Sequence, residues 1–440
     1  MRADCRARCG FVTVGLFGRR APAWLASISA MNRRQFLSTH LSATLASGAT
    51  AEGRKIAAVV TVYRPNSHAD VIVGKYLEGY NQDGRPPRPA SRIASLYVAQ
   101  TPANDMSRAL AHKHGVPIYR TIYEALTLGG DSLAVDGVLL IGEHGDYPVN
   151  DKLQTLYPRF EMFLEITDVF RRSGRAVPVF NDKHLSYSWI KARRMVEIAR
   201  ELKFPFMAGS SIPVTYRRPD WDLEWGARIR RAVAVSYSGL DIYGFHLLES
   251  LQAVVERRAG GETGVRAVQC LQYGAVWEYL DRTPWARRLL EAALARSMTL
   301  EPGPWRERVK EPAVFLLEYR DGLEAAAFLL TGAVRDFTVA VERAGASEPE
   351  STLMWAEGQR PYWHFACLIA NIEKMFETGV PPYPVERTLL ASMALDWLLE
   401  SRIQGNRRLE TPMLEVRYQA PRESTYCRGL PPRPTAPASG

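Results

Sequence analysis

The chain has 440 residues, of which 46% are hydrophobic and 23% are charged. These are the proportions of a globular protein, so collagen-like, coiled-coil and disordered chains are excluded, and the length favours two domains. The formal net charge is +9, but residues 1–51 carry seven arginines against one aspartate, whereas the other residues carry 49 basic and 46 acidic side chains. The small surplus on that larger part does not favour nucleic-acid binding.

The cysteines are few and widely spaced: Cys5, Cys9, Cys270, Cys367 and Cys427. This scatter does not predict a disulfide framework, and no pair has the Cys-x-x-Cys spacing of a metal site. Cys270 and Cys367 lie in apolar segments, which predicts buried, unpaired side chains. No apolar run reaches about 18 residues, so we expect no transmembrane span.

The first 51 residues have the pattern of a leader. Arg33-Arg34-Gln35-Phe36-Leu37 opens a weakly hydrophobic Ser/Thr/Ala-rich stretch that ends at Ala49-Thr50-Ala51. This order resembles a twin-arginine export signal with a small-residue cleavage site, and Met31 is then the expected start. We therefore expect the twin-arginine machinery to export the folded protein to the periplasm. A basic tail without a targeting role is the alternative.

Strands and helices alternate after residue 51. Short apolar runs predict buried strands over residues 56–62, 93–99, 116–119, 135–141, 176–180 and 204–208. Helical patterns fall between them over residues 69–80, 103–114 and 189–202, the second ending at Gly115. Such alternation predicts an α/β fold with a Rossmann-like, doubly wound parallel sheet over residues 52–212.

The pattern changes in residues 213–418. Longer strands are predicted over residues 265–271, 313–319, 323–330 and 337–341, and Asp321-Gly322 predicts a hairpin turn between the middle two. Helices are expected over residues 363–376 and 385–402. We therefore expect a C-terminal α+β domain with a largely antiparallel open sheet, followed by a disordered tail over residues 419–440.

Several ordered motifs carry a family resemblance. They are the strand at 135–141, Asn181-Asp182-Lys183 before an amphipathic helix, the Asp241 to His246 segment, and a closing helix over residues 384–402. Over residues 55–415 the chain resembles the Gfo/Idh/MocA-type oxidoreductases, named for glucose-fructose oxidoreductase and inositol dehydrogenase. The resemblance implies a nicotinamide dinucleotide cofactor, a sugar- or polyol-like substrate, and a C-terminal sheet that often forms a homo-oligomer interface.

The resemblance also implies catalytic residues. Lys183 would polarise a substrate hydroxyl, and His246 would accept its proton as general base. Asp241 would orient His246, although it lies one residue further away than the family pattern has it, and Tyr243 is a substitute proton donor. Asp182 and His184 stand where the family has Glu and Pro. The alternatives are a loop lysine and a buried structural histidine.

The cofactor segment departs most from the family. After the first strand the family has Gly-x-Gly-x-x-Gly, whose glycines let the backbone approach the pyrophosphate. This chain has no glycine there. Expected cofactor contacts are Tyr63, Arg64, Asn66, Ser67, His68, Gln100, Gly142 and Glu143. The second strand ends at Gln100 without the acid that binds the ribose of NAD, which favours NADP, or a fold that has lost dinucleotide binding.

Further polar residues are candidates for substrate binding. They are His144, Asp146, His184 and Trp221. Glu143, His144 and Asp146 follow the fourth strand, so metal-assisted hydrolysis remains a third alternative, although we expect no metal site. Core packing is the alternative for Trp221.

Overall fold

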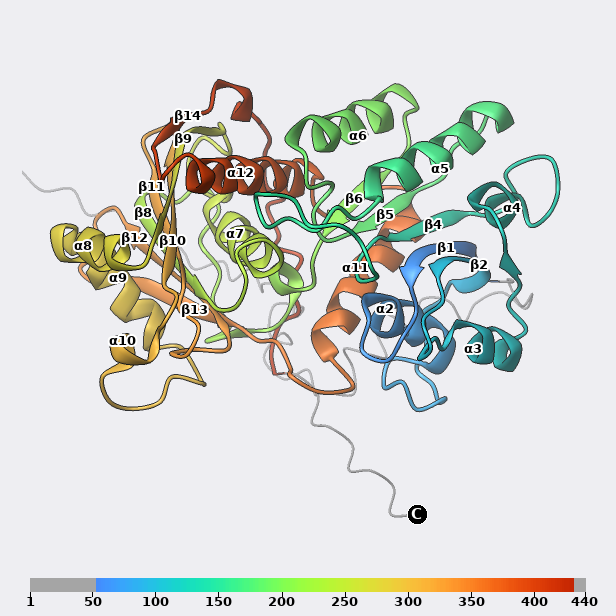
Figure 1. Ribbon diagram of the computed structural model, residues 1–440, viewed down its shortest axis with the longest axis horizontal. Helices are drawn as coiled ribbons and strands as arrows, with labels where there is room; N and C mark the ends of the chain where they lie inside the picture. Colours follow the sequence, from blue (N-terminus) through green and yellow to red (C-terminus); the bar gives the residue numbers. More distant parts are fainter. Residues whose placement is uncertain (1–52, 431–440) are drawn as a thin grey trace, which may run out of the picture. The chain divides into compact units, whose positions relative to one another are not determined.

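The structure, a computed structural model, describes residues 53–430 (Figure 1). Its first sheet has six parallel strands in the order β3-β2-β1-β4-β5-β6. The strands are β1 (Lys55–Val62), β2 (Arg92–Gln100), β3 (Ile118–Tyr119), β4 (Gly137–Ile141), β5 (Val179–Asp182) and β6 (Phe206–Gly209). The central strands are short buried apolar runs, as expected of a sheet covered on both faces. The predicted Rossmann-like fold class is confirmed.

The strand order reverses between β1 and β4. These two strands pair directly, although β2 and β3 lie between them in the sequence. Ligands of open parallel sheets bind beyond the carboxyl ends of the strands at such a reversal. The segments that follow Val62, Ile141 and Asp182 are therefore where a ligand site is expected.

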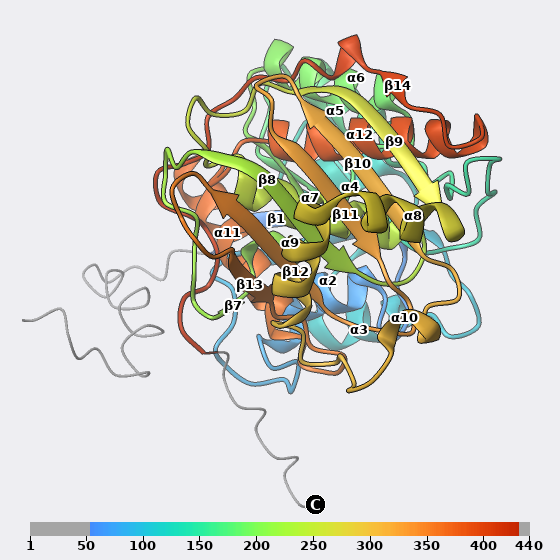
Figure 2. The same cartoon turned by 90° about the vertical axis from the view of Figure 1, so that its left-hand side faces the viewer.

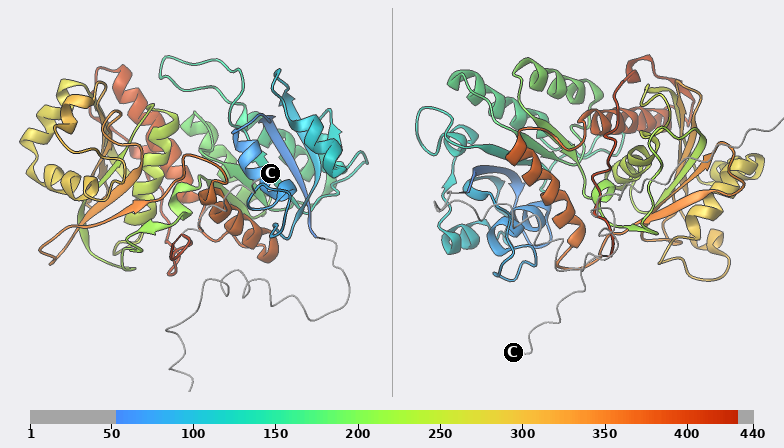
Figure 3. Two further views of the ribbon diagram at one scale, coloured as in Figure 1. Left: turned by 90° about the horizontal axis from the view of Figure 1, so that it is seen from below. Right: turned by 180° about the vertical axis from the view of Figure 1, so that it is seen from behind.

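Helices cover both faces of this sheet (Figure 1). They are α2 (His68–Glu78), α3 (Ser107–His114), α4 (Ile122–Thr127), α5 (Arg159–Ser173) and α6 (Trp189–Glu201). Ser67 caps α2 by accepting the Asp70 amide, and Gly115 ends α3 in the left-handed conformation at φ 65°, as predicted. On the α2 face the cover is completed by α11 (Trp363–Thr378), which lies beside α2 although it comes much later in the chain (Figure 3).

The second sheet has eight strands in the order β14-β9-β10-β11-β8-β12-β13-β7. They are β7 (Arg217–Arg218), β8 (Ile229–Ser236), β9 (Val265–Gln272), β10 (Ala313–Tyr319), β11 (Glu324–Leu329), β12 (Phe337–Arg343), β13 (Glu350–Met354) and β14 (Leu409–Glu410). All neighbours are antiparallel except β8 and β11, so the predicted largely antiparallel sheet is confirmed. The predicted turn at Asp321-Gly322 joins β10 to β11, with Gly322 at φ 90°.

Helices lie on both faces of the second sheet as well. One face packs against α7 (Ile242–Val255) and α12 (Glu386–Ile403), whose apolar core is continuous with that of the first sheet. Across the opposite face lie α8 (Gly274–Arg282) and α9 (Pro284–Leu294), with the short α10 (Trp305–Arg308) nearby (Figure 2). Short 3₁₀ turns, η2 (Ile212–Val214) and η3 (Pro412–Leu414), complete the described elements.

Two expectations about the C-terminal region differ from the structure. Cys367 is buried but not unpaired, because it forms a disulfide with Cys427. The two residues are 60 positions apart in sequence, yet packing of the last segment beside α11 brings their Cα atoms to 5.9 Å. Residues 419–430, which the sequence assigns to a tail, are held by hydrogen bonds to Asp220, Trp225, Arg257 and Asn371. Cys270 is buried and free, as predicted.

The expected export signal, Cys5 and Cys9 fall in residues 1–52, which lie outside the described residues, as do residues 431–440. Among residues 53–430, no helix combines the length and the apolar character needed to cross a bilayer. The domain boundary at residue 212 remains a prediction.

Candidate functional site

A buried charge cluster (Glu143, Arg159 and Lys183) lies beyond the carboxyl ends of β4 and β5. Lys183 Nζ is 3.1 Å from Glu143 Oε1, and the Arg159 guanidinium binds the other carboxylate oxygen. All three side chains are almost completely buried. Burial alone would raise the pKa of the Glu143 carboxyl, but the charges of Lys183 and Arg159 outweigh it and hold that pKa well below its usual value. Glu143 is therefore a carboxylate at neutral pH.

The backbone at Lys183 has an unusual conformation. Its φ is 62°, in the left-handed region, and its amide donates to the Gly209 carbonyl at 3.1 Å. A long side chain in this region costs about 1–2 kcal/mol, a cost that is found most often at functional positions. This turn after β5 brings the ammonium to Glu143.

His68 and Asp182 form a second pair at the same edge of the sheet. Nδ1 of His68 lies 2.6 Å from Oδ2 of Asp182. The His68 ring centroid is 5.3 Å from that of His144 and 5.2 Å from that of Phe365 on α11. Because burial and the neighbouring His68 lower the pKa of His144 to about 3, His144 is neutral at physiological pH.

His246 is contributed by α7 and belongs to the same electrostatic environment. Burial, with the charge of Lys183, lowers the pKa of His246 well below its usual value, so its ring is neutral. The ring lies against Tyr243 and Phe337, at centroid distances of 5.8 and 5.9 Å. Asp241 does not hydrogen-bond His246. Its Oδ2 accepts from the Thr155 amide at 3.3 Å, and burial raises its pKa to about 6.

Several buried polar atoms around the cluster have no hydrogen-bond partner within the described chain. They are Asp182 Oδ1, Asp241 Oδ1 and the Nδ1 atoms of His144, His184 and His246. Buried polar atoms are nearly always satisfied, so a group of unsatisfied ones requires a bound partner or a functional reason. Carboxylate oxygens accept, and a neutral imidazole nitrogen either donates or accepts, so hydroxyl groups, which do both, would suit this set.

The first loop does not fit the pyrophosphate of a dinucleotide. The Asn66 amide donates to the Asp70 carboxylate at 2.8 Å, and the Ser67 amide donates to the Arg64 carbonyl at 3.0 Å. Asp70 is buried at the start of α2 and is also bound by Arg360. A carboxylate of the chain therefore takes the place that the helix N-terminus would offer to an anion. Tyr63 fills the loop with a side chain that has no exposed surface.

The end of β2 is also occupied by protein contacts. Gln100 accepts from the Asp146 amide at 2.8 Å and donates to its carbonyl at 3.0 Å. These two bonds tie the end of β2, where a ribose is expected, to the loop after β4. We therefore assign no residue of this chain to dinucleotide binding on structural grounds, and the predicted cofactor contacts remain predictions.

The other predicted residues occupy varied positions. His184 is buried, with Nε2 3.2 Å from Arg159 Nη1, and so joins the charge cluster. Gly142 allows close approach of Arg159, because a Cβ there would lie 2.6 Å from Arg159 Cγ. The Asp146 side chain is exposed. Trp221 packs on the main core, and its carbonyl accepts from Arg217.

Sequence reasoning did not identify Arg159 or Phe365 as site residues. Arg159 opens α5 after an irregular loop, and Phe365 comes from a helix about 300 residues after His68. No periodic pattern signals either contact. Within the described chain, no three His, Cys, Asp or Glu side chains are grouped so that they could hold a metal ion.

No protein-family model and no curated protein matches the sequence. Solved structures do match. GenD2 from gentamicin A biosynthesis, solved in complex with NAD, is 14% identical, with a TM-score of 0.49 over 83% of this chain and 98% of that chain. A probable dehydrogenase from Thermotoga maritima is 13% identical, with a TM-score of 0.48 over 82% of this chain and 99% of that chain.

A scyllo-inositol dehydrogenase from Lactobacillus casei, solved with NAD(H) and scyllo-inositol, is 12% identical, with a TM-score of 0.49 over 81% of this chain and 99% of that chain. These values describe a distant resemblance in fold and leave reaction and ligand open for this chain.

Proposed function

We propose that the protein is an enzyme that acts on a sugar- or polyol-like substrate at the buried charge cluster. The observation that carries the proposal is the group of buried, unpartnered polar atoms around Lys183 and Glu143. Burying charged and unsatisfied groups costs several kcal/mol. Apolar side chains would fill the same space without that cost, so packing alone does not explain why these groups are here. A ligand with several hydroxyl groups would satisfy them.

The chain's own residues suit acid–base work on such a ligand. Lys183, held by Glu143, would donate to a substrate oxygen and stabilise negative charge that develops there. His246 is neutral and offers an acceptor for a hydroxyl proton. Asp241 has a pKa of about 6, close to neutrality, which suits a group that exchanges a proton at physiological pH. Arg159 would hold Glu143 in place.

The reaction class that the family resemblance favours is oxidoreduction with NAD or NADP. The dehydrogenases that resemble the fold are consistent with it. The first loop favours a second candidate, a protein that keeps the ligand site but no longer binds a dinucleotide, because the Asn66 amide is already bound by Asp70. We therefore derive no step through a dinucleotide.

One purification distinguishes these candidates. The protein is purified without added nucleotide and denatured, and the supernatant is analysed by mass spectrometry. Released NAD or NADP supports the oxidoreductase. No released nucleotide, together with no thermal shift at millimolar NAD or NADP, rules it out and leaves the second candidate.

Ligand binding is tested separately, by calorimetry with a panel of sugars and polyols. We expect binding to the wild type and to Lys310→Met, which changes an exposed lysine. We expect none to Lys183→Met. Equal binding by Lys183→Met, or no binding of any polyol to the wild type, would contradict the proposed site.

We also propose export through the twin-arginine pathway. The disulfide between Cys367 and Cys427 supports it, because disulfides form and persist in oxidising compartments such as the periplasm.

A further inference from the structure

The last described segment, residues 419–430, forms a strap across the molecule, which we call the C-terminal strap. Its backbone is held by side chains from separate elements. Arg257 donates to the carbonyls of Pro421 and Arg422 at 2.9 and 3.0 Å, and Asn371 on α11 donates to the Thr425 carbonyl at 3.0 Å. The strap therefore connects the second sheet region to α11.

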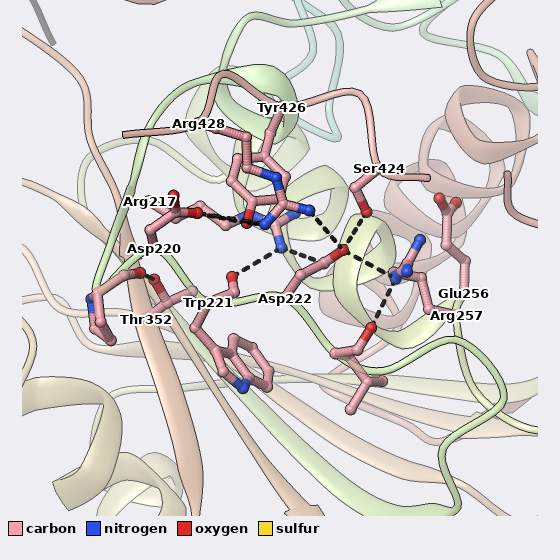
Figure 4. Close-up of polar contacts among 12 residues, drawn as sticks. Arg217, Asp220, Trp221, Asp222, Glu256, Arg257, Thr352, Ser424, Tyr426 and Arg428 are labelled. Carbon is pink, nitrogen blue, oxygen red and sulfur yellow. Dashed lines mark hydrogen bonds and ion pairs between the residues drawn. The ribbon is translucent and has the colours of Figure 1, made fainter. Parts of the chain in front are cut away.

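Asp222 is the centre of the polar contacts that hold the strap (Figure 4). Arg217 Nη1 lies 2.6 Å from one carboxylate oxygen, and Arg257 Nε lies 3.2 Å from the other. Ser424 of the strap donates to the same carboxylate. Tyr426 stacks under the Arg217 guanidinium, 4.1 Å from the ring centroid. Asp222 and Arg217 are largely buried, so these charge-assisted contacts are strong compared with surface pairs.

The strap is also bound covalently to α11. Cys427 of the strap pairs with Cys367, and the Cys427 amide donates to the Val214 carbonyl at 2.9 Å. Cys367 follows His364 by three positions and Phe365 by two, so the disulfide lies on the first turns of α11.

Those first turns form one wall of the candidate site. The rings of Phe365 and His68 are nearly perpendicular, with a centroid distance of 5.2 Å, and His364 packs on Phe365 at 4.7 Å. His68 in turn holds Asp182, the residue before Lys183. A displacement of this end of α11 would therefore remove the support of the His68 ring.

We infer that the C-terminal strap is a positioning element of the site, and that its disulfide makes the placement of His68 depend on oxidation. The strap contributes no group to the cluster itself. It acts through α11 on His68, so the complete site forms only after the two thiols are oxidised. The inference rests on the proposed function in one respect only, namely that the region around His68 and the buried charge cluster is the ligand site.

The oxidation is a two-electron thiol–disulfide exchange with the disulfide of a thiol oxidoreductase. Cys427 is partly exposed and Cys367 is 2% exposed, so the Cys427 thiolate is the accessible nucleophile. It attacks the oxidant's disulfide and releases one oxidant thiolate. The Cys367 thiolate then attacks Cys427 Sγ and releases the second. The two electrons and the two protons end on the oxidant, which leaves as a dithiol.

The test compares oxidised wild type, mildly reduced wild type and Cys367→Ser/Cys427→Ser, with Cys270→Ser as the matched control for loss of a buried thiol. Hydrogen exchange is followed in peptides that cover α11, the strap and β10. Carbethoxylation by diethyl pyrocarbonate is measured at His68, whose side chain is 13% exposed, and at the exposed His112 as internal reference.

In the reduced protein and the double serine variant we expect exchange in the strap and the first turns of α11 to rise about tenfold or more, with β10 unchanged. Modification of His68 should accelerate severalfold relative to His112. Faster hydrogen exchange in the strap, with unchanged exchange in α11 and unchanged modification of His68, would overturn the inference. The disulfide would then hold only the strap itself in place. A simultaneous rise in β10 would overturn it too, since the disulfide would then hold the whole fold.

If the serine variant does not fold, the reduced wild type gives the same readouts. No readout uses a substrate or a nucleotide, so the outcome is independent of whether the proposed function holds.

Discussion

His68 Nδ1 lies 2.6 Å from Asp182 Oδ2, and the pair spans the end of β4, because His68 follows β1 and Asp182 ends β5. Side chains of this chain thus bridge the reversal point of the sheet, where open α/β folds bind ligands. The hydrogen bond from the Asn66 amide to Asp70 lies in the same region. A ligand at this point must therefore bind beside these two interactions within the protein.

The charge cluster should behave as one energetic unit. Lys183→Met leaves the buried Glu143 carboxylate with Arg159 alone, so we expect it to lower the free energy of unfolding by about 3 kcal/mol. A double-mutant cycle with Glu143→Gln should give a coupling energy of at least about 1 kcal/mol in urea unfolding. The exposed pair Arg172 and Asp168 is the control, with an expected coupling below about 0.5 kcal/mol. Additive effects at Lys183 and Glu143 would contradict the cluster.

Asp241 should make stability depend on pH. Its pKa is raised by burial from 3.8 to about 6, so the folded state holds the proton more tightly and wild-type stability falls as pH rises through this window. Asp241→Asn keeps an acceptor for the Thr155 amide and carries no charge. We expect it to be more stable than wild type by about 3 kcal/mol at pH 8 and nearly equal to it near pH 4. Urea unfolding at both pH values measures this.

The exposed Asp131→Asn is the control for that pH series and should show no such difference. A constant offset between Asp241→Asn and wild type at both pH values would show that Asp241 titrates normally.

Asn66 takes a left-handed backbone conformation in the loop after the first strand. Its φ is 61°. Both Asn66→Gly and Asn66→Ala lose the hydrogen bond from Tyr362, so their difference isolates the backbone. We expect the alanine variant to be less stable than the glycine variant by about 1 kcal/mol. Equal thermal unfolding of the two would show that the loop does not need this conformation.

The outer face of the second sheet should not be an oligomer interface. Its apolar half is covered by α8 and α9, as Figure 2 shows, and the rest carries ion pairs. Glu318 binds Arg266 at 2.8 Å and also Arg408. Because α8 and α9 already cover the apolar half of this face, we expect cross-linking followed by light scattering to show no oligomer that is joined through it. An oligomer with cross-links on α8, α9 or Glu318 would contradict this prediction.

Export should require the arginine pair of the leader. Arg33→Lys with Arg34→Lys should retain the protein in the cytoplasm, whereas Arg19→Lys with Arg20→Lys should not, because the expected start at Met31 lies after them. Fractionation and immunoblotting measure both. Unchanged export of the first variant would refute the twin-arginine signal.

The first sheet was predictable because most of its strands are short apolar runs, which is the pattern of strands that are buried on both faces of a parallel sheet. The exception is β5, predicted over residues 176–180 but found at Val179–Asp182, since its last residues are polar. Asn181 and Asp182 are buried at the site, but both residue types have low strand propensity, so the sequence predicts that the strand ends before them. In the second sheet, β8 was missed because Arg230 and Arg231 interrupt the apolar pattern at its start.

Part of the site was predictable from the positions of the predicted strands. Glu143, Lys183 and His184 follow predicted strands, and the ends of parallel strands meet at one edge. His246 was found through the family motif. Arg159 and the Cys367–Cys427 pair depend on packing between segments that no local pattern connects, so only the three-dimensional structure reveals them.

The position of α11 has a consequence for how the protein acquires its fold. Ile372, Met375 and Phe376 of this helix bury the face of the first sheet that includes Ile56 and Leu139. During synthesis, residues 52–212 would therefore emerge long before the helix that covers them. The N-terminal region should remain an intermediate with exposed apolar surface until residues 363–378 have been synthesised, and an excised fragment of residues 52–212 should aggregate rather than fold.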